Sequence, residues 1–171
     1  VTVVDAPEAV TIGSETINVI QGKTFKLPVT MSRKDGKECL ATYTLKTSNK
    51  KYVAVNSDGE VKGVKAGKAT VTVTTSNDLT TKCTIVVRKS PTKVTLDKTS
   101  LVIGEGTSAN LQAKISYKGG SFVYNAVDRD SVGSFSSANT AIATVDANGV
   151  VKGIAKGETT ITFKTLNGKS K

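Results

Sequence analysis

Cys39 and Cys83 carry the most reactive side chains in a chain of 171 residues that contains no histidine. Without histidine the chain cannot build a Ser-His-Asp or Cys-His catalytic site, nor a zinc site that uses histidine ligands. Two cysteines outside a CxxC motif are not a zinc pattern either. The chemistry left to the two thiols is therefore a disulfide.

The disulfide depends on which way the two thiols face. Counting back by twos along an extended segment puts Cys39 on the face of Leu45, and Cys83 shares a face with Val87. If both faces point inward, a Cys39–Cys83 bond would close a loop of about 43 residues and add on the order of 4 kcal/mol. The alternative is a pair of buried thiols that never meet.

Asp128 and Asp130 flank Arg129, and alternate residues of an extended segment lie on one side of it. Such a pair could act as general acid and base. Nothing in the sequence forms a pocket around the pair, and an Asp-Arg-Asp run in a loop is typical of solvated charge. The sequence therefore predicts no catalytic residue, no cofactor and no enzyme.

Two Asx-rich turns carry oxygen ligands that suit calcium, in the pairs Asn56/Asp58 and Asp146/Asn148. Each pair offers only two side chains, whereas calcium takes about six to eight ligands. Each pair also lies beside a glycine between two apolar runs, as hairpin turns require. We therefore predict turns here and no metal site.

Three of the eight aromatic side chains lie close together, at Tyr117, Phe122 and Tyr124, around a Gly119-Gly120 hairpin turn. Exposed aromatic side chains are common at interfaces, so these three could stack on a sugar or pack against a protein. The alternative, which we favour, is that Phe122 and Tyr124 share one face of a strand and fill the core.

The charge is strongly basic, with 24 Lys and Arg against 14 Asp and Glu. It is spread along the chain without a nucleic-acid-binding motif, so no nucleic-acid partner is expected. A diffuse positive surface favours salt-dependent contact with an anionic wall polymer or an acidic glycan; the alternative is a solvated surface with no partner. No apolar run reaches the ~18–20 residues of a membrane span.

An internal repeat supplies the elements that must position these residues. Residues 55–75 and 145–165 align 90 positions apart with 9 of 21 identical residues, while the earlier parts align at an offset of 84. The change from 84 to 90 marks a six-residue insertion in the second copy. Ser90-Pro91 marks the junction between the two copies, because proline has no N–H to donate to a sheet. We predict two domains, 1–89 and 90–171.

Each copy alternates apolar and hydroxyl residues with period two, most clearly in 68–74 and 158–164. Short strands separated by turns predict an all-β sandwich. Residues 1–5 correspond to the tail of a preceding repeat, and the second copy stops before the counterpart of Cys83–Val87. We therefore expect its last strand to be missing. Residues 1–5 of a neighbouring molecule could fill the unpaired edge, or the chain could self-associate through it.

Two long segments carry a family resemblance, VTLDKTSLVIGE at 94–105 and FSSANTAIATVDANGVVKGIAKGETTIT at 135–162. They resemble the bacterial immunoglobulin-like domain, group 2, although the usual Trp is Leu45 in one copy and Phe135 in the other. The resemblance implies two tandem Greek-key β-sandwiches on a secreted or surface-anchored bacterial protein, extracellular and without catalytic residues. The function it implies is a spacer that projects neighbouring domains. The alternative is an adhesive or carbohydrate- and wall-binding module, with a glycan or host protein as partner.

Overall fold

The computed structural model describes residues 5–39 and 41–171. The chain divides into two compact units, Val1–Arg88 (unit 1) and Lys89–Lys171 (unit 2), whereas the limits expected from the sequence, 1–89 and 90–171, put the boundary one residue later. Apart from a single 3₁₀ turn at Ala126–Asp128, the regular elements of the described residues are β-strands. Residues 1–5 were expected to be the tail of a preceding repeat, and residues 1–4 of these lie outside the described part of the chain.

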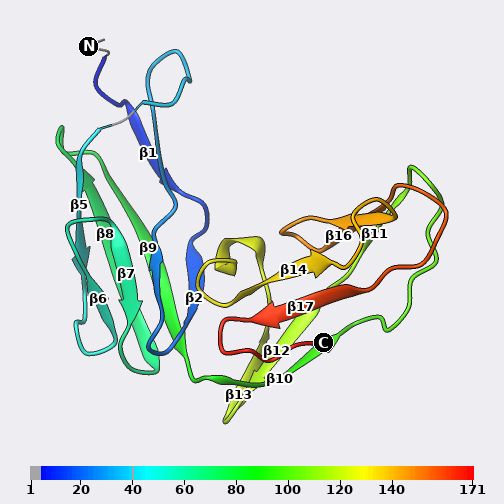
Figure 1. Ribbon diagram of the computed structural model, residues 1–171. Helices are drawn as coiled ribbons and strands as arrows, with labels where there is room; N and C mark the ends of the chain where they lie inside the picture. Colours follow the sequence, from blue (N-terminus) through cyan, green and yellow to red (C-terminus); the bar gives the residue numbers. More distant parts are fainter. Residues whose placement is uncertain (1–4, 40) are drawn as a thin grey trace. The chain divides into compact units, whose positions relative to one another are not determined.

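Unit 1 folds into three sheets (Figure 1). The largest has four strands in the order β2-β9-β8-β5, and the others have the orders β3-β7-β6 and β1-β4. The strands are β1 (Ala9–Ile12), β2 (Thr16–Ile20), β3 (Thr24–Lys26), β4 (Val29–Ser32), β5 (Tyr43–Thr47), β6 (Val53–Val55), β7 (Glu60–Gly63), β8 (Gly67–Thr75) and β9 (Thr80–Arg88).

Unit 2 repeats this arrangement with fewer paired strands. Its sheets have the orders β10-β12-β13, β11-β16-β15 and β14-β17. The strands are β10 (Pro91–Leu96), β11 (Ser108–Asn110), β12 (Ala113–Tyr117), β13 (Gly120–Val123), β14 (Gly133–Ser137), β15 (Ala143–Val145), β16 (Val150–Gly153) and β17 (Ile161–Thr165). Both units are immunoglobulin-like Greek-key sandwiches, as the sequence predicts.

The period-two pattern explains the strand at the centre of unit 1. In β8 the side chains of Ala69, Val71 and Val73 are buried, while the threonines between them face outward. β8 pairs with β5 on one side and β9 on the other, and β9 pairs in parallel with β2. β9 therefore lies between two strands and has neighbours along both of its edges.

The turns that the sequence predicts at the two Asx-Gly sites are confirmed. Ser57–Gly59 joins β6 to β7, and Ala147–Gly149 joins β15 to β16, in antiparallel pairs. The insertion of unit 2 forms the predicted hairpin, with β12 paired to β13 around Gly119, whose φ is 105°. No helix in the described residues is long and apolar enough to cross a membrane.

Candidate functional site

Both cysteines are buried, but not for the reason expected at Cys39. β5 begins only at Tyr43, so the strand that was extended back to Cys39 does not exist there. Cys39 instead follows an isolated bridge between Ser32 and Glu38, and its N–H donates to the Met31 carbonyl at 3.0 Å. Cys83 lies inside β9 with 1% of its surface exposed. The structure holds both residues as thiols, and their disulfide stays a prediction.

Asp128 is fully buried, which corrects the expectation of a solvated Asp-Arg-Asp loop. It ends the 3₁₀ turn that follows Tyr124, and its carboxylate accepts the backbone N–H of Asn125 at 3.4 Å. The Asn125 side chain caps the same turn by accepting the Val127 N–H at 3.3 Å. Asp130 lies on the surface. The two carboxylates therefore occupy different environments, and Asp128 closes a turn.

The three aromatic residues of the insertion are not brought together. Tyr124 is only 8% exposed, and its ring packs edge-on against Phe163 at 4.7 Å and Phe135 at 5.8 Å between centroids. Phe135 and Phe163 are 4.9 Å apart, so the three rings form one aromatic cluster. Tyr124 thus fills the core of unit 2, as favoured above, but Phe122 does not join it.

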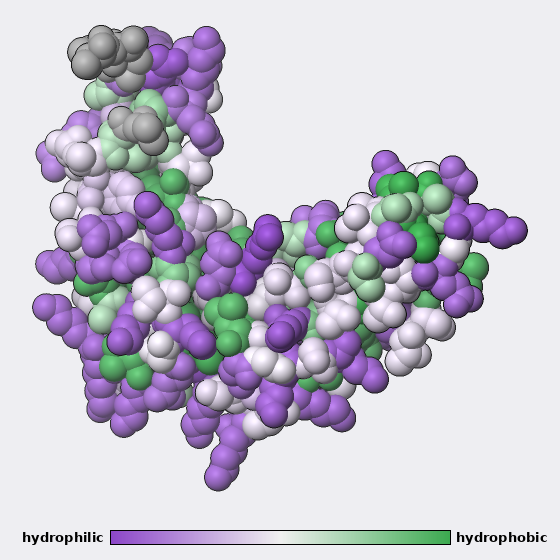
Figure 2. Space-filling view, in the orientation of Figure 1, coloured by the Kyte–Doolittle hydropathy of each residue, from purple (hydrophilic) through white to green (hydrophobic). Residues whose placement is uncertain are grey.

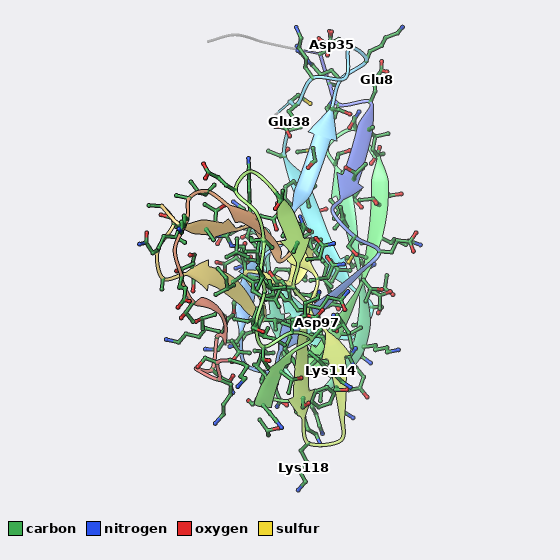
Figure 3. The ribbon with its side chains drawn as sticks, turned by 90° about the vertical axis from the view of Figure 1, so that its right-hand side faces the viewer. Glu8, Asp35, Glu38, Asp97, Lys114 and Lys118 are labelled. Carbon is green, nitrogen blue, oxygen red and sulfur yellow. The ribbon has the colours of Figure 1, made fainter. Side chains whose placement is uncertain are left out.

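Tyr117 and Phe122 form a separate, half-buried ring pair. Their centroids are 6.3 Å apart with the planes tilted by 49°. Tyr117 closes β12, and Phe122 lies opposite Ile115 in β13, while Lys118 points outward from the turn between them (Figure 3). The candidate binding surface Tyr117, Phe122 and Tyr124 therefore reduces in this geometry to the hairpin β12–β13 with its two rings. Whether the hairpin binds a ligand stays a prediction.

The hydroxyl of Tyr124 is buried with no hydrogen-bond partner among the described residues. Burial raises the pKa of Tyr124 to about 12, and the negative charge of Asp128 adds to the rise. The phenol therefore stays protonated and neutral at any physiological pH. The tyrosine acts here as a ring in the core and supplies no acid or base near neutrality.

The Asx residues considered as calcium ligands are occupied in their own turns. Asn56 Oδ1 accepts the N–H groups of Asp58 at 3.1 Å and Glu60 at 2.9 Å. Asp146 Oδ1 accepts those of Asn148 at 2.9 Å and Val150 at 2.8 Å. These equivalent Asx turns fix both hairpins, in agreement with the turn interpretation.

Glu8, Asp35 and Glu38 all lie at one end of unit 1 (Figure 3). Asp35 is bound by Arg33 at 3.0 Å and lies 4.0 Å from the Lys37 ammonium. In the described residues no group of three or more Cys, Asp or Glu side chains is arranged to hold a metal ion. An open hollow lies on β3-β7-β6, where Thr24, Asn56 and Lys62 line it.

The sequence analysis missed a long-range side-chain hydrogen bond that is present in both units. Asn77 Nδ2 donates to the Pro7 carbonyl at 2.8 Å, and Asn167 Nδ2 donates to that of Pro91 at 2.9 Å. A buried threonine two residues earlier donates its hydroxyl to the Asn oxygen at 2.7 Å in each unit. The signal was visible in the sequence, because Thr-x-Asn recurs 90 positions apart.

The model of the family described as bacterial Ig-like domain (group 2) matches residues 6–85 and 91–171. Ice-binding protein 1 of Shewanella frigidimarina (strain NCIMB 400) is 26% identical over 156 residues, which are 90% of this chain and 17% of that protein. The chain thus spans 17% of the curated relative that it matches.

Solved structures to which the chain is similar include domains of the S-layer protein SbsC. Its domains 4 and 5 share 22% sequence identity, with a TM-score of 0.38 over 95% of this chain and 92% of that one. Its domains 5-6 share 18% identity, with a TM-score of 0.47 over 96% and 93% of the two chains.

Proposed function

Because the chain belongs to the bacterial Ig-like domain (group 2) family, we propose that it is a non-enzymatic spacer in a secreted or surface-anchored bacterial protein. Its mechanism is geometric, since each unit buries its own core and adds one domain length between the neighbours that it separates. The proposal places the segment outside the cell, where such a spacer projects other domains from the surface. It requires no cofactor and no catalytic residue.

The path of the chain through unit 1 carries this proposal. β1 starts at one end of the sandwich and β9 finishes at the opposite end (Figure 1). β9 ends at Arg88 and β10 begins at Pro91, so only Lys89 and Ser90 separate a strand of one unit from a strand of the next. Pro91 has a fixed φ, which restricts the junction further. A chain that enters and leaves a domain at opposite ends adds length at every repeat.

Small-angle X-ray scattering tests the spacer. The intact chain is expected to give an elongated particle with a narrow range of maximum dimensions. A matched variant with ten Gly-Ser residues inserted between Lys89 and Ser90 is expected to give a broader distribution, because such linkers behave as flexible coils. Equally broad distributions for both chains would contradict a spacer with a restricted junction.

A second function is supported by the hairpin β12–β13, which is longer than its counterpart in the described part of unit 1. There the described residues after β4 form the isolated bridge of Ser32 with Glu38. The ring pair Tyr117 and Phe122, with Lys118 at the tip, has the chemistry to contact a glycan, an anionic wall polymer or a host protein. We propose this adhesive role as the alternative to the spacer.

A glycan array and a wall-polymer pull-down test the alternative at low and at moderate salt. Binding that falls at least about tenfold in Tyr117→Ala/Phe122→Ala would support the hairpin as the site. Tyr52→Ala is the matched control, since Tyr52 is an aromatic residue of unit 1 that lies 5.9 Å from the Lys51 ammonium. No retained ligand with the unmodified chain at either salt concentration would exclude the adhesive role.

A further inference from the structure

The outer face of the four-stranded sheet β2-β9-β8-β5 in unit 1 consists mainly of threonine and lysine. In β8 the buried residues alternate with Lys68, Thr70, Thr72 and Thr74, which therefore face outward. Residues directly opposite one another in a ladder lie on the same side of a sheet. The partners of these four residues in β5 and β9 complete the face: Thr44, Lys46, Thr80, Lys82, Thr84 and Val86. All but Val86 are polar, and none is aromatic.

Three lysines of this face stand close together. Lys46 and Lys82 both lie opposite Thr72, in the strands on either side of β8. Because neighbouring strands are about 4.8 Å apart, the Cα atoms of these two lysines are separated by about 10 Å. Lys68 precedes Thr72 in the same strand, at about 13 Å along it. All three lysine side chains are exposed, and none forms an ion pair with a described residue.

No carboxylate lies within the face to neutralise the lysines, because the strands β2, β5, β8 and β9 contain no Asp or Glu. Glu15 and Asp78 border the sheet from the connections before β2 and between β8 and β9. Glu8, Asp35 and Glu38 lie at one end of the unit (Figure 3). The visible surface of unit 1 as a whole is mostly hydrophilic, with small, separated hydrophobic areas (Figure 2). The positive field of the sheet face favours an anionic partner.

Protection of strand edges does not account for these lysines. A lysine on an edge strand hinders pairing with another chain, and among the described strands β5 is at the edge of the sheet. β8 and β9, however, each have a paired strand on both sides, so Lys68 and Lys82 guard no edge. The fold does not need the charge either, since Ser136 and Glu158 stand in unit 2 ninety positions after Lys46 and Lys68. The accumulation of positive charge is therefore a property of unit 1 alone.

The threonine hydroxyls add neutral donors between the ammonium groups. The Thr44 hydroxyl lies 3.5 Å from the Thr74 carbonyl oxygen, whereas those of Thr70, Thr72 and Thr84 have no hydrogen-bond partner among the described residues. A hydroxyl and an ammonium both donate hydrogen bonds to phosphate oxygens, and lysine binds phosphate as a point charge. The face has no aromatic ring on which a sugar could stack. These groups therefore fit a flexible chain of phosphodiesters better than a carboxylated polysaccharide.

We propose that the outer face of the sheet β2-β9-β8-β5 binds a polyol phosphate chain, a linear polymer in which phosphodiesters alternate with polyol units. Lys46 and Lys82 each neutralise one phosphodiester, the Thr72 hydroxyl donates to the chain between them, and Lys68 binds a further phosphate. This site is separate from the hairpin β12–β13, which belongs to unit 2. The proposal gives the surface role proposed above a partner and rests on that role, although the binding is measurable whether or not the chain is a spacer.

An NMR titration of the full chain with lipid-free poly(glycerol phosphate) at low salt locates the site. The amide signals of Lys46 and Thr72 are expected to shift, while those of Ser136 and Thr162 at the equivalent positions of unit 2 stay in place. Unit 2 thus serves as the internal reference for unspecific attraction. Shifts of the same size in both units, or no shifts on this face of unit 1, would overturn the proposal.

Two double variants with the same net charge separate the site from general electrostatic attraction. Lys46→Gln/Lys82→Gln should weaken binding of the polymer at least about tenfold and reduce its dependence on salt, because two ion pairs are lost. Lys26→Gln/Lys62→Gln removes the same charge from exposed positions of the sheet β3-β7-β6 in the same unit, and should weaken binding less than about threefold. Equal losses in the two variants would mean that only the net charge matters, which would refute the site.

Other polymers and the hairpin variant test the assignment of the partner. Polygalacturonate, which carries carboxylates on sugar rings, is expected to bind more weakly than poly(glycerol phosphate), and neutral dextran is expected not to bind. Polygalacturonate binding of equal strength would overturn the phosphodiester assignment. Tyr117→Ala/Phe122→Ala should leave the binding of poly(glycerol phosphate) unchanged, and a loss there would place the site on the hairpin instead. A failure of the spacer in the scattering experiment would leave all of these results unaltered.

Discussion

The two units build the same sandwich around different cores. Where unit 1 has Leu45 and Val73, unit 2 has Phe135 and Phe163 ninety positions later, and Tyr124 from the insertion packs against both rings. In unit 1 the strands β5 and β8 belong to the four-stranded sheet β2-β9-β8-β5, whereas their counterparts in unit 2, β14 and β17, pair as a two-stranded sheet. The comparison teaches that the insertion supplies a core side chain as well as a surface hairpin.

The largest expected effect follows from the aromatic cluster. Phe163→Ala removes a fully buried ring that touches Tyr124 and Phe135, so it should destabilise unit 2 by about 3–5 kcal/mol. The equivalent Val73→Ala deletes less volume and should cost unit 1 about 2 kcal/mol. Urea unfolding followed by amide NMR signals reads each unit separately in the full chain. Equal losses in the two units would mean that the rings contribute no more than aliphatic packing does.

The equivalent glycines Gly59 and Gly149 differ in the atoms that surround them. Gly59 and Gly149 have φ of 79° and 81°, which strains any residue with a Cβ. A Cβ at Gly149 would run into the Leu111 carbonyl oxygen, a rigid backbone group, whereas one at Gly59 would meet the hydroxyl end of Tyr43. Gly149→Ala should therefore cost about 3 kcal/mol and Gly59→Ala about 1–2 kcal/mol. The same urea titration measures both, and the reverse order would contradict the difference in contact.

Much of this architecture could be predicted from the sequence because it depends on local patterns. Alternation places Val71 and Val73 inside, and the Asx-Gly pairs specify their turns wherever they occur. The repeat offset located the insertion, since a change in spacing needs no structural knowledge. These features follow from residues close in sequence.

The misplaced residues depend on contacts that no local pattern reports. Cys39 was assigned to the strand of Leu45, but that strand begins only at Tyr43. The segment at Cys39 pairs instead with the end of β4, through the bridge of Ser32 with Glu38. Asp128 was expected in solvent because it is ionisable, yet the turn after Tyr124 carries it inside. Phe122 and Tyr124 are two residues apart and would share one face of a continuous strand. β13 ends between them at Val123, so the alternation does not extend to Tyr124.

The third prediction uses the buried phenol that unit 1 lacks. The pKa of Tyr124 is raised from 10.0 to about 12, so the folded state keeps a proton that the unfolded state loses first. This stabilisation is complete below pH 10 and is lost as pH rises toward 12, by about 2–3 kcal/mol in all. Tyr124→Phe should remove that loss from unit 2. It should also leave the stability at neutral pH unchanged or slightly higher, since the hydroxyl has no partner among the described residues.

Unit 1 of the same molecule is the control for the alkaline titration. Unit 1 lacks the buried phenol of Tyr124, so only the difference between the unfolding curves of the two units is assigned to that side chain. Urea midpoints for each unit between pH 9 and 12 supply that difference. An alkaline loss that is the same in Tyr124→Phe as in the unmodified chain would show that the phenol stays protonated equally well in the unfolded state.

The smallest expected effect concerns a pair of positions that changed together. Unit 1 has Gly13 opposite Pro28, which has no N–H, whereas unit 2 has Asp97 opposite Gln112. The Gln112 N–H donates to the Asp97 carboxylate at 2.7 Å, and this bond is the main cause that lowers the pKa of Asp97, helped by the Lys98 ammonium at 3.1 Å. The carboxylate thus satisfies a backbone donor that unit 1 does not have.

The lowered pKa fixes the sign of the pH dependence. A carboxyl group whose folded-state pKa lies below its ordinary value of 3.8 stabilises the fold above that pH, and the contribution is lost as pH falls through the folded-state pKa. Because the side chain of Asp97 is 37% exposed, the whole contribution should stay below about 1 kcal/mol.

Asp97→Asn keeps an acceptor for the Gln112 N–H but has no charge to lose, so unit 2 of this variant should unfold with a weaker dependence on pH below about 4. Urea midpoints for both units at pH 2 to 5 measure this, with Asp58→Asn as the matched control because its carboxylate is exposed in a turn of unit 1. If the two variants changed the acid dependence of their units equally, the bond to Gln112 would add nothing beyond ordinary surface charge, and the exchange of Pro28 for Gln112 would be neutral for stability.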